Sequence, residues 1–305
     1  MIDAGALAAV LKPALGEVSI ENLRVLTGGA SRATWAFNAD DRALILRVGP
    51  PDEVHAGMEL EAAALSRAAA TGAPVPQVLA ASNSAEALGN PFLICDFVPG
   101  ETIVRKIHRA LDDPGRARLL RQCAEALASI HRADPTGIGL SSEGQLGSWR
   151  HELDEIGDTT ATFEWAFRWL QLNQPADTGD SVLVHGDFRM GNLIVDSSGL
   201  AAVLDWELTH TGSRAEDLAW FCIRAWRFGA PRALELEHLA RALEGQAEMI
   251  LESLEDEERG SREHPAVEQL HDVRRADGGD DVGFLLEALD HLLVLTQVEV
   301  DGLDD

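Results

Sequence analysis

The segment LVHGDFRMGNLIVD, residues 183–196, constrains this chain more than any other part of its sequence. Apolar and β-branched residues stand at both ends of the segment, and four polar or charged side chains interrupt them. These side chains are His185, Asp187, Arg189 and Asn192. An ordinary hairpin turn needs only Gly, Asn or Asp. The cluster therefore indicates chemistry rather than a simple connection between two strands.

The next stretch predicts where the polar cluster lies. The segments NLIVD and LAAVLDW can pair as a hairpin around residues 196–199. Asn192 would then begin the first strand and Asp205 would end the second, side by side at the open end. An amide oxygen beside a carboxylate is a pair of hard oxygen ligands that suits Mg²⁺. Asp187 precedes Asn192 by five residues and would lie at the same end.

This spacing is typical of the catalytic loop of phosphoryl-transfer enzymes. In that loop an Asp accepts the proton of the attacking hydroxyl, and an Asn five residues later and a further Asp hold metal. The spacing predicts Asp187 as the catalytic base and Asn192 and Asp205 as metal ligands. Each residue alone could be structural, as a turn cap or a strand end. The combined pattern favours the catalytic interpretation.

The N-terminal third has the pattern of a small sheet. A short helix over about 3–15 precedes three segments typical of strands, SIENLRVL, ATWAFNA and RALILRV. A helix over 53–70 follows, and PQVLAAS and NPFLICDF are two more predicted strands. This order predicts an antiparallel sheet that carries one helix.

Helical patterns dominate beyond the connector VPGE at 98–101. Asp113 and Pro114 predict the start of a helix that runs to His131, and 148–172 predicts another. Ser213 and Glu216 predict a capping box at the start of a further helix. We therefore expect an α+β fold of two lobes, residues 1–97 and 98–305, with a hinge at about 95–100.

Two features of the predicted N-terminal lobe suggest phosphate binding. The backbone N–H groups of Gly28, Gly29, Ala30 and Ser31 could cover phosphates, although a Gly-Gly loop between strands can also be an ordinary turn. A kinase also needs a cation that reaches the phosphates and pairs with a helix glutamate. The only lysines, Lys12 and Lys106, lie elsewhere in the sequence.

Arg47 is therefore the candidate for the phosphate-binding cation. A guanidinium stays charged and can bind phosphate oxygens with two N–H groups. Its predicted partner is Glu61, with Glu59 the less favoured choice. On the strand pattern alone, Arg47 could equally be an exposed surface residue.

Composition excludes several classes of protein. The formal net charge of −26 over 305 residues argues against a nucleic-acid partner. No apolar run approaches the roughly 18 residues that a membrane span needs, and no basic region precedes the first Ala-rich stretch, as it would in a signal peptide. The three cysteines form no CxxC pair. They are expected to be buried free thiols, which predicts a cytoplasmic protein.

With these residues assembled, the chain resembles the aminoglycoside phosphotransferase/choline kinase-like family of small-molecule kinases. The resemblance covers about residues 23–232. It looks closest to the branch of kinase-like domains fused to acyl-CoA dehydrogenases, in which DWE is usual. The matching segments are LTGGASRATWAF, LILRV, TGAPVPQVL, NPFLICDFVPGE, ALASIHRAD, LVHGDFRMGNLIVD, VLDWELTHTG and EDLAWF.

The resemblance implies a protein-kinase-like bilobal fold that uses ATP and Mg²⁺. Adenine would lie against the hinge, with backbone contacts near Asp96 and Val98, and Ser31 and its loop would meet the phosphates. Protein-kinase motifs such as H-R-D, D-F-G and A-P-E are missing, which argues against a protein substrate. His185 is expected to order the catalytic loop, and Asp217 to help hold it.

The expected partner is a small hydroxylated molecule. Two classes of acceptor and one function without turnover remain possible. A hydroxy acid or hydroxyacyl thioester is preferred, because Arg189 and Arg214 supply positive charge around the HGD loop. An aminoglycoside is the alternative acceptor, since the acidic chain would suit a polycation. A nucleotide-binding pseudokinase without turnover is the alternative of another class. Residues 233–305 depart from the family pattern, so the acceptor is not defined by the sequence.

Overall fold

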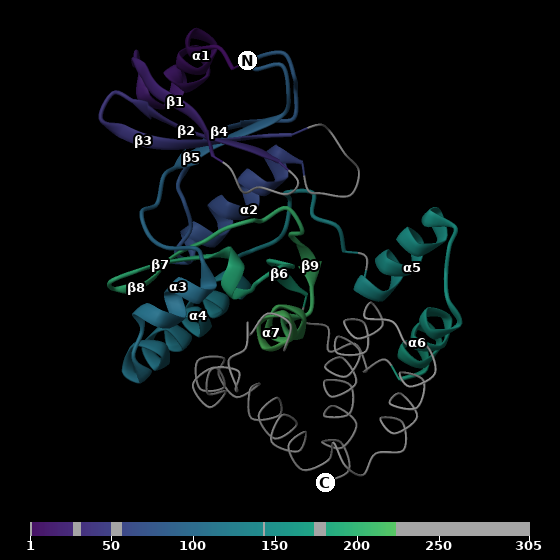
Figure 1. Cartoon of the computed structure of the whole chain (residues 1–305). Helices are drawn as coiled ribbons and strands as arrows, with labels where there is room; N and C mark the ends of the chain where they lie inside the picture. The colour runs from purple at the N-terminus through teal and green to yellow at the C-terminus, as the bar shows by residue number, and fades with distance from the viewer. Residues whose placement is uncertain (1, 27–31, 50–56, 143, 174–180, 224–305) are drawn as a thin grey trace.

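A five-stranded antiparallel sheet forms the N-terminal part of the molecule (Figure 1). The computed structural model describes residues 2–26, 32–49, 57–142, 144–173 and 181–223. The strand order in the sheet is β1-β2-β3-β5-β4. The strands are β1 (Ile20–Leu26), β2 (Ala33–Ala39), β3 (Arg42–Val48), β4 (Val78–Ser82) and β5 (Phe92–Asp96).

Two helices cover opposite faces of this sheet, because alternate strand residues point to opposite sides. Helix α1 (Ala4–Leu15) buries Leu7 and Leu11 against Leu44 and Leu46 of β3. Helix α2 (Met58–Ala70) packs on the other face, where Leu93 and Cys95 of β5 join its buried residues. The side of the sheet that carries α2 also faces the rest of the chain (Figure 1).

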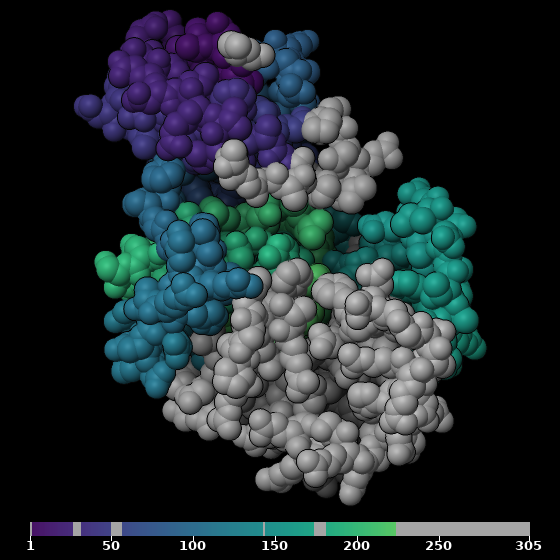
Figure 2. Space-filling view, viewed as in Figure 1, coloured from purple at the N-terminus to yellow at the C-terminus, as the bar shows by residue number. Residues whose placement is uncertain are grey.

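The C-terminal part combines helices with two short two-stranded sheets. Its central helix, α4, packs against α2, β6 and β8. The helices are α3 (Val104–Ala110), α4 (Asp113–Arg132), α5 (Gln145–Ile156), α6 (Ala161–Leu172) and α7 (Arg214–Cys222). The strands are β6 (Val182–Val184), β7 (Leu193–Asp196), β8 (Gly199–Val203) and β9 (His210–Gly212). In Figure 2 the N-terminal residues form a body above the green strands, and α5 and α6 project to one side.

The predicted elements are present among the described residues, but three helix boundaries differ, and α3 and β9 were not predicted. The cap of α4 is Asp112 rather than Asp113, because its carboxylate accepts the N–H of Gly115 at 2.9 Å. The helix predicted over 148–172 is two helices, since Gly157 adopts a left-handed conformation (φ 70°) that ends α5. Helix α2 begins at Met58, and the earlier part of its predicted range, like the segment 233–305, lies outside the described residues.

Two findings bear on the expectations from composition. Cys95, Cys123 and Cys222 are buried free thiols, as predicted. Burial raises the pKa of the Cys95 thiol to about 12, so it is protonated at neutral pH. Across the part of the chain that the structure describes, no helix has the length and apolarity to cross a membrane.

Candidate active site

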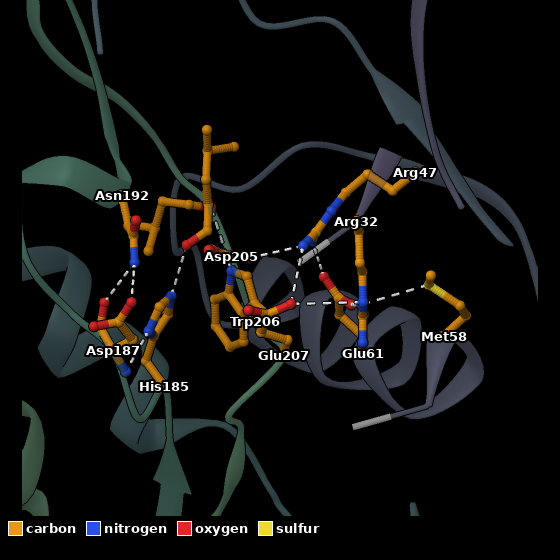
Figure 3. Close-up of polar contacts among 12 residues, drawn as sticks. Arg32, Arg47, Met58, Glu61, His185, Asp187, Asn192, Asp205, Trp206 and Glu207 are labelled. Carbon is orange, nitrogen blue, oxygen red and sulfur yellow. Dashed lines mark hydrogen bonds and ion pairs between the residues drawn. The ribbon is translucent and has the colours of Figure 1, made fainter. Parts of the chain in front are cut away.

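Asp187 lies in the loop between β6 and a single 3₁₀ turn, η1 (Met190–Asn192). Its carboxylate receives donors from two residues of the same loop. Asn192 Nδ2 lies 2.6 Å from Oδ2, and Arg189 Nε lies 2.8 Å from Oδ1. Asn192 Nδ2 also donates to the backbone carbonyl of Asp187 at 2.9 Å. The structure therefore brings Asp187 and Asn192 into direct contact (Figure 3).

His185 joins this loop to the segment that carries Asp205. Its Nδ1 accepts the backbone N–H of Asp187 at 3.2 Å, so the proton of the neutral ring is on Nε2, which can donate to the carbonyl of Leu204 at 2.9 Å. The ring is buried and packs edge-on against Trp206, with centroids 4.8 Å apart. These contacts agree with the prediction that His185 orders the loop.

Asp217, in the first turn of α7, holds the start of the loop and has no exposed surface. Its Oδ2 accepts the N–H of His185 and its Oδ1 accepts the N–H of Gly186, both at 2.9 Å. His131 Nε2, from α4, also lies 2.9 Å from Oδ2. Burial alone would raise the pKa of Asp217, but the hydrogen bond and charge of His131 and the donors around His185 lower it overall. Asp217 therefore ties α4, α7 and the loop together.

Asp205 follows β8 at the open end of the predicted hairpin. Leu193 pairs with Val203, and the N–H of Leu204 donates to the carbonyl of Asn192 at 2.8 Å. Asp205 is therefore one residue beyond the partner of Asn192, as the pattern predicted. Its φ of 67° lies in the left-handed region, where few residues other than glycine are found.

Two arginines share the carboxylate of Glu61, which has no exposed surface. Arg47, from β3, contacts Oε1, and Arg32, which precedes β2, contacts Oε2. The predicted pair of Arg47 with Glu61 is thus confirmed. The less favoured partner, Glu59, instead accepts the N–H of Asn83 at 3.2 Å.

The same arginines reach the segment after β8 (Figure 3). Arg47 Nη2 lies 2.7 Å from Asp205 Oδ1 and 3.7 Å from Glu207 Oε2, and Arg32 Nε lies 3.5 Å from that Glu207 oxygen. Burial by itself would lower the pKa of Arg47, but the charges of Glu61, Asp205 and Glu207 raise it above its ordinary value. Arg47 therefore stays positively charged, and this network of five charged side chains connects the sheet, α2 and the hairpin.

Arg32 and Glu207 are members of this network that the sequence pattern did not single out. Arg32 directly follows the Gly-rich loop, and Glu207 ends the DWE segment. In the sequence, only the composition indicated that further arginines would join the site. With two lysines among 25 Lys and Arg residues, a cluster of carboxylates in this chain must be neutralised mainly by arginines.

The side chain of Arg189 passes close to Gly191 and contacts Asp187. A Cβ atom added to Gly191 would lie 2.6 Å from Arg189 Nη1, closer than real Cβ contacts allow. Gly191 is not among the glycines with positive φ, so its backbone conformation does not require glycine. The missing side chain instead gives Arg189 the space to reach the Asp187 carboxylate.

Asp96 and Val98 lie where the sheet continues towards α3. Arg42 binds both carboxylate oxygens of Asp96, with Nε at 2.7 Å and Nη2 at 2.9 Å. The backbone N–H groups of residues 96 and 97 each donate to a protein carbonyl at 3.0 Å. Val98 comes next, and no hydrogen bond of its N–H is found among the described residues, so its backbone could meet an adenine ring.

The predicted phosphate loop lies outside the described residues, and so do Gly28, Gly29, Ala30 and Ser31. Both strands that it joins are described. Leu26, at the end of β1, pairs with Thr34 of β2, and Thr34 pairs with Arg47. The strand residues on either side of this segment therefore lie at the same end of the sheet as Arg47.

A further polar cluster, in which His210 is buried and Gln145 and Glu216 are half-buried, connects α5, β9 and α7. His210 Nε2 lies 2.9 Å from one oxygen of Glu216, and Gln145 Nε2 lies 2.6 Å from the other. Ser213 caps α7 by accepting the N–H of Ala215. The predicted capping box does not form, because the Ser213 hydroxyl accepts the N–H of Ala215 rather than that of Glu216, and the Glu216 carboxylate turns to His210 and Gln145.

The residues at the hairpin end fit a magnesium ion that is shared with phosphates. Asn192 uses Nδ2 for Asp187 and keeps Oδ1 available, while Asp205 offers a carboxylate oxygen. No group of three or more His, Cys, Asp or Glu side chains within the described ranges could hold a metal ion. Two protein oxygens are enough for Mg²⁺, which takes its other ligands from water and phosphate.

Solved structures show that the chain has a kinase-like fold. A thermostable mutant of aminoglycoside phosphotransferase APH(4)-Ia, in complex with AMP-PNP and hygromycin B, aligns with a TM-score of 0.58 and 21% identity over 98% of this chain and 100% of that one. Macrolide 2'-phosphotransferase MphH from Brachybacterium faecium aligns with a TM-score of 0.53 and 20% identity over 93% and 97%. The predicted α+β, kinase-like fold is confirmed.

The chain belongs to the phosphotransferase enzyme family, whose model matches residues 22–260. Acyl-CoA dehydrogenase family member 10 of Mus musculus is 30% identical over 240 residues, which cover 73% of this chain but 22% of that protein. Family member 11 of Gallus gallus is 29% identical over 65% of this chain and 27% of its own length. The chain thus spans about a quarter of these relatives, and the predicted family branch is confirmed.

A relative of another kind is hygromycin-B 4-O-kinase of Escherichia coli. It is 24% identical over 228 residues, which cover 68% of this chain and 64% of that protein. This relative and the family model support phosphotransfer to small molecules as the reaction class of the family.

Proposed function

We propose that this chain transfers the γ-phosphoryl group of ATP to a hydroxyl group of a small molecule, with Mg²⁺ as cofactor. The observation that carries the proposal is the set of contacts around Asp187. Its carboxylate is oriented by Asn192 and Arg189, and Asp205 lies at the adjoining hairpin end. Membership of the phosphotransferase family supports the reaction class.

Each residue of the set has one task in this reaction. Asp187 accepts the proton of the acceptor hydroxyl as its oxygen bonds to the γ-phosphorus and the bond from that phosphorus to the bridging oxygen breaks, which releases ADP. Asn192 and Asp205 hold Mg²⁺, which when bound neutralises charge on the phosphates. Arg47 binds phosphate oxygens, and Glu61 orients Arg47. Positioning and charge neutralisation supply most of the rate enhancement in such transfers.

The nucleotide would lie between the two lobes, residues 1–97 and 98–305. The backbone of Gly28, Gly29, Ala30 and Ser31 would cover the phosphates. Adenine would contact the backbone near Asp96 and Val98, within the hinge at 95–100. The N–H of Val98 and the end of the sheet at which Arg47 lies support this placement.

We propose a hydroxy acid or a hydroxyacyl thioester as the acceptor. Arg189 contacts the candidate base itself, and Arg214 is the first residue of α7, the helix whose Asp217 holds the loop. Arginine binds carboxylate and phosphate oxygens well and repels polycations. The similarity to acyl-CoA dehydrogenase family members also supports an acyl acceptor.

An aminoglycoside is the second candidate acceptor. The relative named hygromycin-B 4-O-kinase favours it, and so does the net charge of −26. A pseudokinase is disfavoured because Asp187, Asn192 and Asp205 are all present.

A screen of acceptor-dependent ADP formation tests the proposal. The purified chain would be assayed with Mg–ATP and four acceptor classes: hydroxy acids, hydroxyacyl thioesters, aminoglycosides and amino alcohols. Each reaction would be corrected for ADP formed without an acceptor, and products would be identified by mass spectrometry. We expect the highest kcat/KM with a hydroxy acid or thioester. A higher kcat/KM with aminoglycosides would favour the second candidate, and binding of Mg–ATP without turnover would favour a pseudokinase.

A further inference from the structure

Glu61 has two positively charged partners although one would neutralise it. The carboxylate has no exposed surface, and Arg32 and Arg47 each bind one of its oxygens. The kinase pattern requires only a single cation at this glutamate. The second arginine therefore needs an explanation of its own.

The two arginines differ in how firmly they are held. Arg32 has 7% of its side-chain surface exposed, and it also contacts Glu207 at 3.5 Å and the Met58 sulfur at 3.5 Å. Its stem passes over Gly49, where an added Cβ would lie 3.1 Å from Arg32 Cγ. It is therefore enclosed on several sides by protein atoms.

Arg47 is more exposed than Arg32 and lies nearer to the candidate metal ligands. Its side chain is 17% exposed, and Nη2 lies 2.7 Å from the carboxylate of Asp205. In the proposed reaction this guanidinium binds phosphate oxygens, and Asp205 binds Mg²⁺. Both groups must therefore exchange their mutual contact for new ones when Mg–ATP binds.

The guanidinium of Arg47 contacts Asp205 and Glu61 at the same time, so a turn that moves Nη2 from Asp205 would also loosen the contact of Nη1 with Glu61. A buried carboxylate that loses its counter-ion is strongly destabilised, because the protein interior solvates charge poorly. We propose that Arg32 is the permanent counter-ion of Glu61, which allows Arg47 to turn from Asp205 to the nucleotide phosphates. Glu207 keeps a cation in both arrangements, because it contacts Arg32 as well as Arg47. Arg32 is thus a positioning residue, and this inference rests on the proposed function.

Binding of Mg–AMP-PNP, an ATP analogue, to four proteins tests the inference. Calorimetric titration would compare the wild type with Arg32→Met, Arg32→Lys and the double variant Arg32→Met/Glu61→Gln. Without Arg32, Glu61 holds Arg47 back, so Arg32→Met should weaken binding about tenfold. Arg32→Lys keeps the charge and should bind nearly as the wild type does. The double variant removes the stranded carboxylate and should bind more tightly than Arg32→Met alone.

Arg24→Met, an exposed arginine of β1, is the matched control and should not alter binding. If Arg32→Met does not fold, the double variant should still fold, because the uncompensated carboxylate is gone. The inference is overturned if Arg32→Met binds as the wild type does, if Arg32→Lys loses as much as Arg32→Met, or if Glu61→Gln fails to improve binding or folding. These outcomes leave the proposed function standing. A wild-type protein that binds no Mg–AMP-PNP would instead overturn both.

Discussion

Gly191 determines where the guanidinium of Arg189 can lie. A Cβ at this position would displace Nη1, which is the mobile end of a flexible side chain, so folding should suffer little. Contact with Asp187 should be lost, however. Since a charge-assisted hydrogen bond contributes about 1.5–3 kcal/mol, we expect Gly191→Ala to lower kcat tenfold or more. Its free energy of unfolding should change by less than about 1 kcal/mol.

Steady-state kinetics and denaturant unfolding would be measured on the same preparations of Gly191→Ala. Gly144→Ala is the control, because a Cβ there meets nothing within 4 Å. Arg189→Met should reproduce the kinetic loss. Wild-type kcat in Gly191→Ala would show that the contact between Arg189 and Asp187 has no role in turnover.

At the scale of elements, the carboxylate of Asp217 joins α7, α4 and the candidate catalytic loop. The substitution Asp217→Asn would keep one acceptor oxygen. Its NH₂ group would face the N–H of His185 or Gly186, so two donors would meet and one hydrogen bond would be lost. Breaking a buried charged cluster costs about 3–5 kcal/mol. We expect Asp217→Asn to lower the free energy of unfolding by that amount at pH 7.

The same variant makes a prediction about pH. The pKa of Asp217 in the folded chain is lowered from 3.8, so its carboxylate stabilises the fold fully above that value. This contribution is lost as the pH falls through the folded pKa. Urea unfolding between pH 7 and 3 should therefore show the difference between wild type and Asp217→Asn shrinking below pH 3.8. A difference that is constant or grows there would contradict the role of Asp217. Asp113→Asn, an exposed control on α4, should change stability by less than about 0.5 kcal/mol.

The strands could be predicted well from the sequence because alternation and turn residues are local signals. RALILRV is β3 to the residue, and NLIVD with LAAVLDW forms the expected hairpin. The boundary between α5 and α6 was missed although local signals mark it, because Gly157 ends α5 and Thr160 caps α6. The cap of α4 was misplaced by one residue because Asp112 and Asp113 are both good caps, and only the geometry of the Gly115 N–H distinguishes them.

At the scale of the whole molecule, some residues of the candidate site could be predicted from local sequence patterns and others only from the folded structure. Asp187, Asn192 and Asp205 are close in sequence, so one spacing pattern indicated all three. Arg47 and Glu61 followed from the requirement for a phosphate-binding cation. Arg32 and Glu207 meet only because the sheet, α2 and the hairpin come together, and no local pattern records a contact between residues 175 positions apart.

The turnover rate of Asp187→Asn tests the proposed phosphotransfer, and the role of Asp187 as its base, most directly. The substitution preserves size but removes the base, and a general base contributes about 10²–10⁴-fold to rate. Acceptor-dependent ADP formation should therefore fall by that factor, while Mg–AMP-PNP still binds, because Asn192 and Asp205 remain. Asp196→Asn, at the exposed tip of the same hairpin, should retain full activity. Turnover by Asp187→Asn equal to that of the wild type, with any accepted substrate, would contradict the assignment of Asp187 as the base.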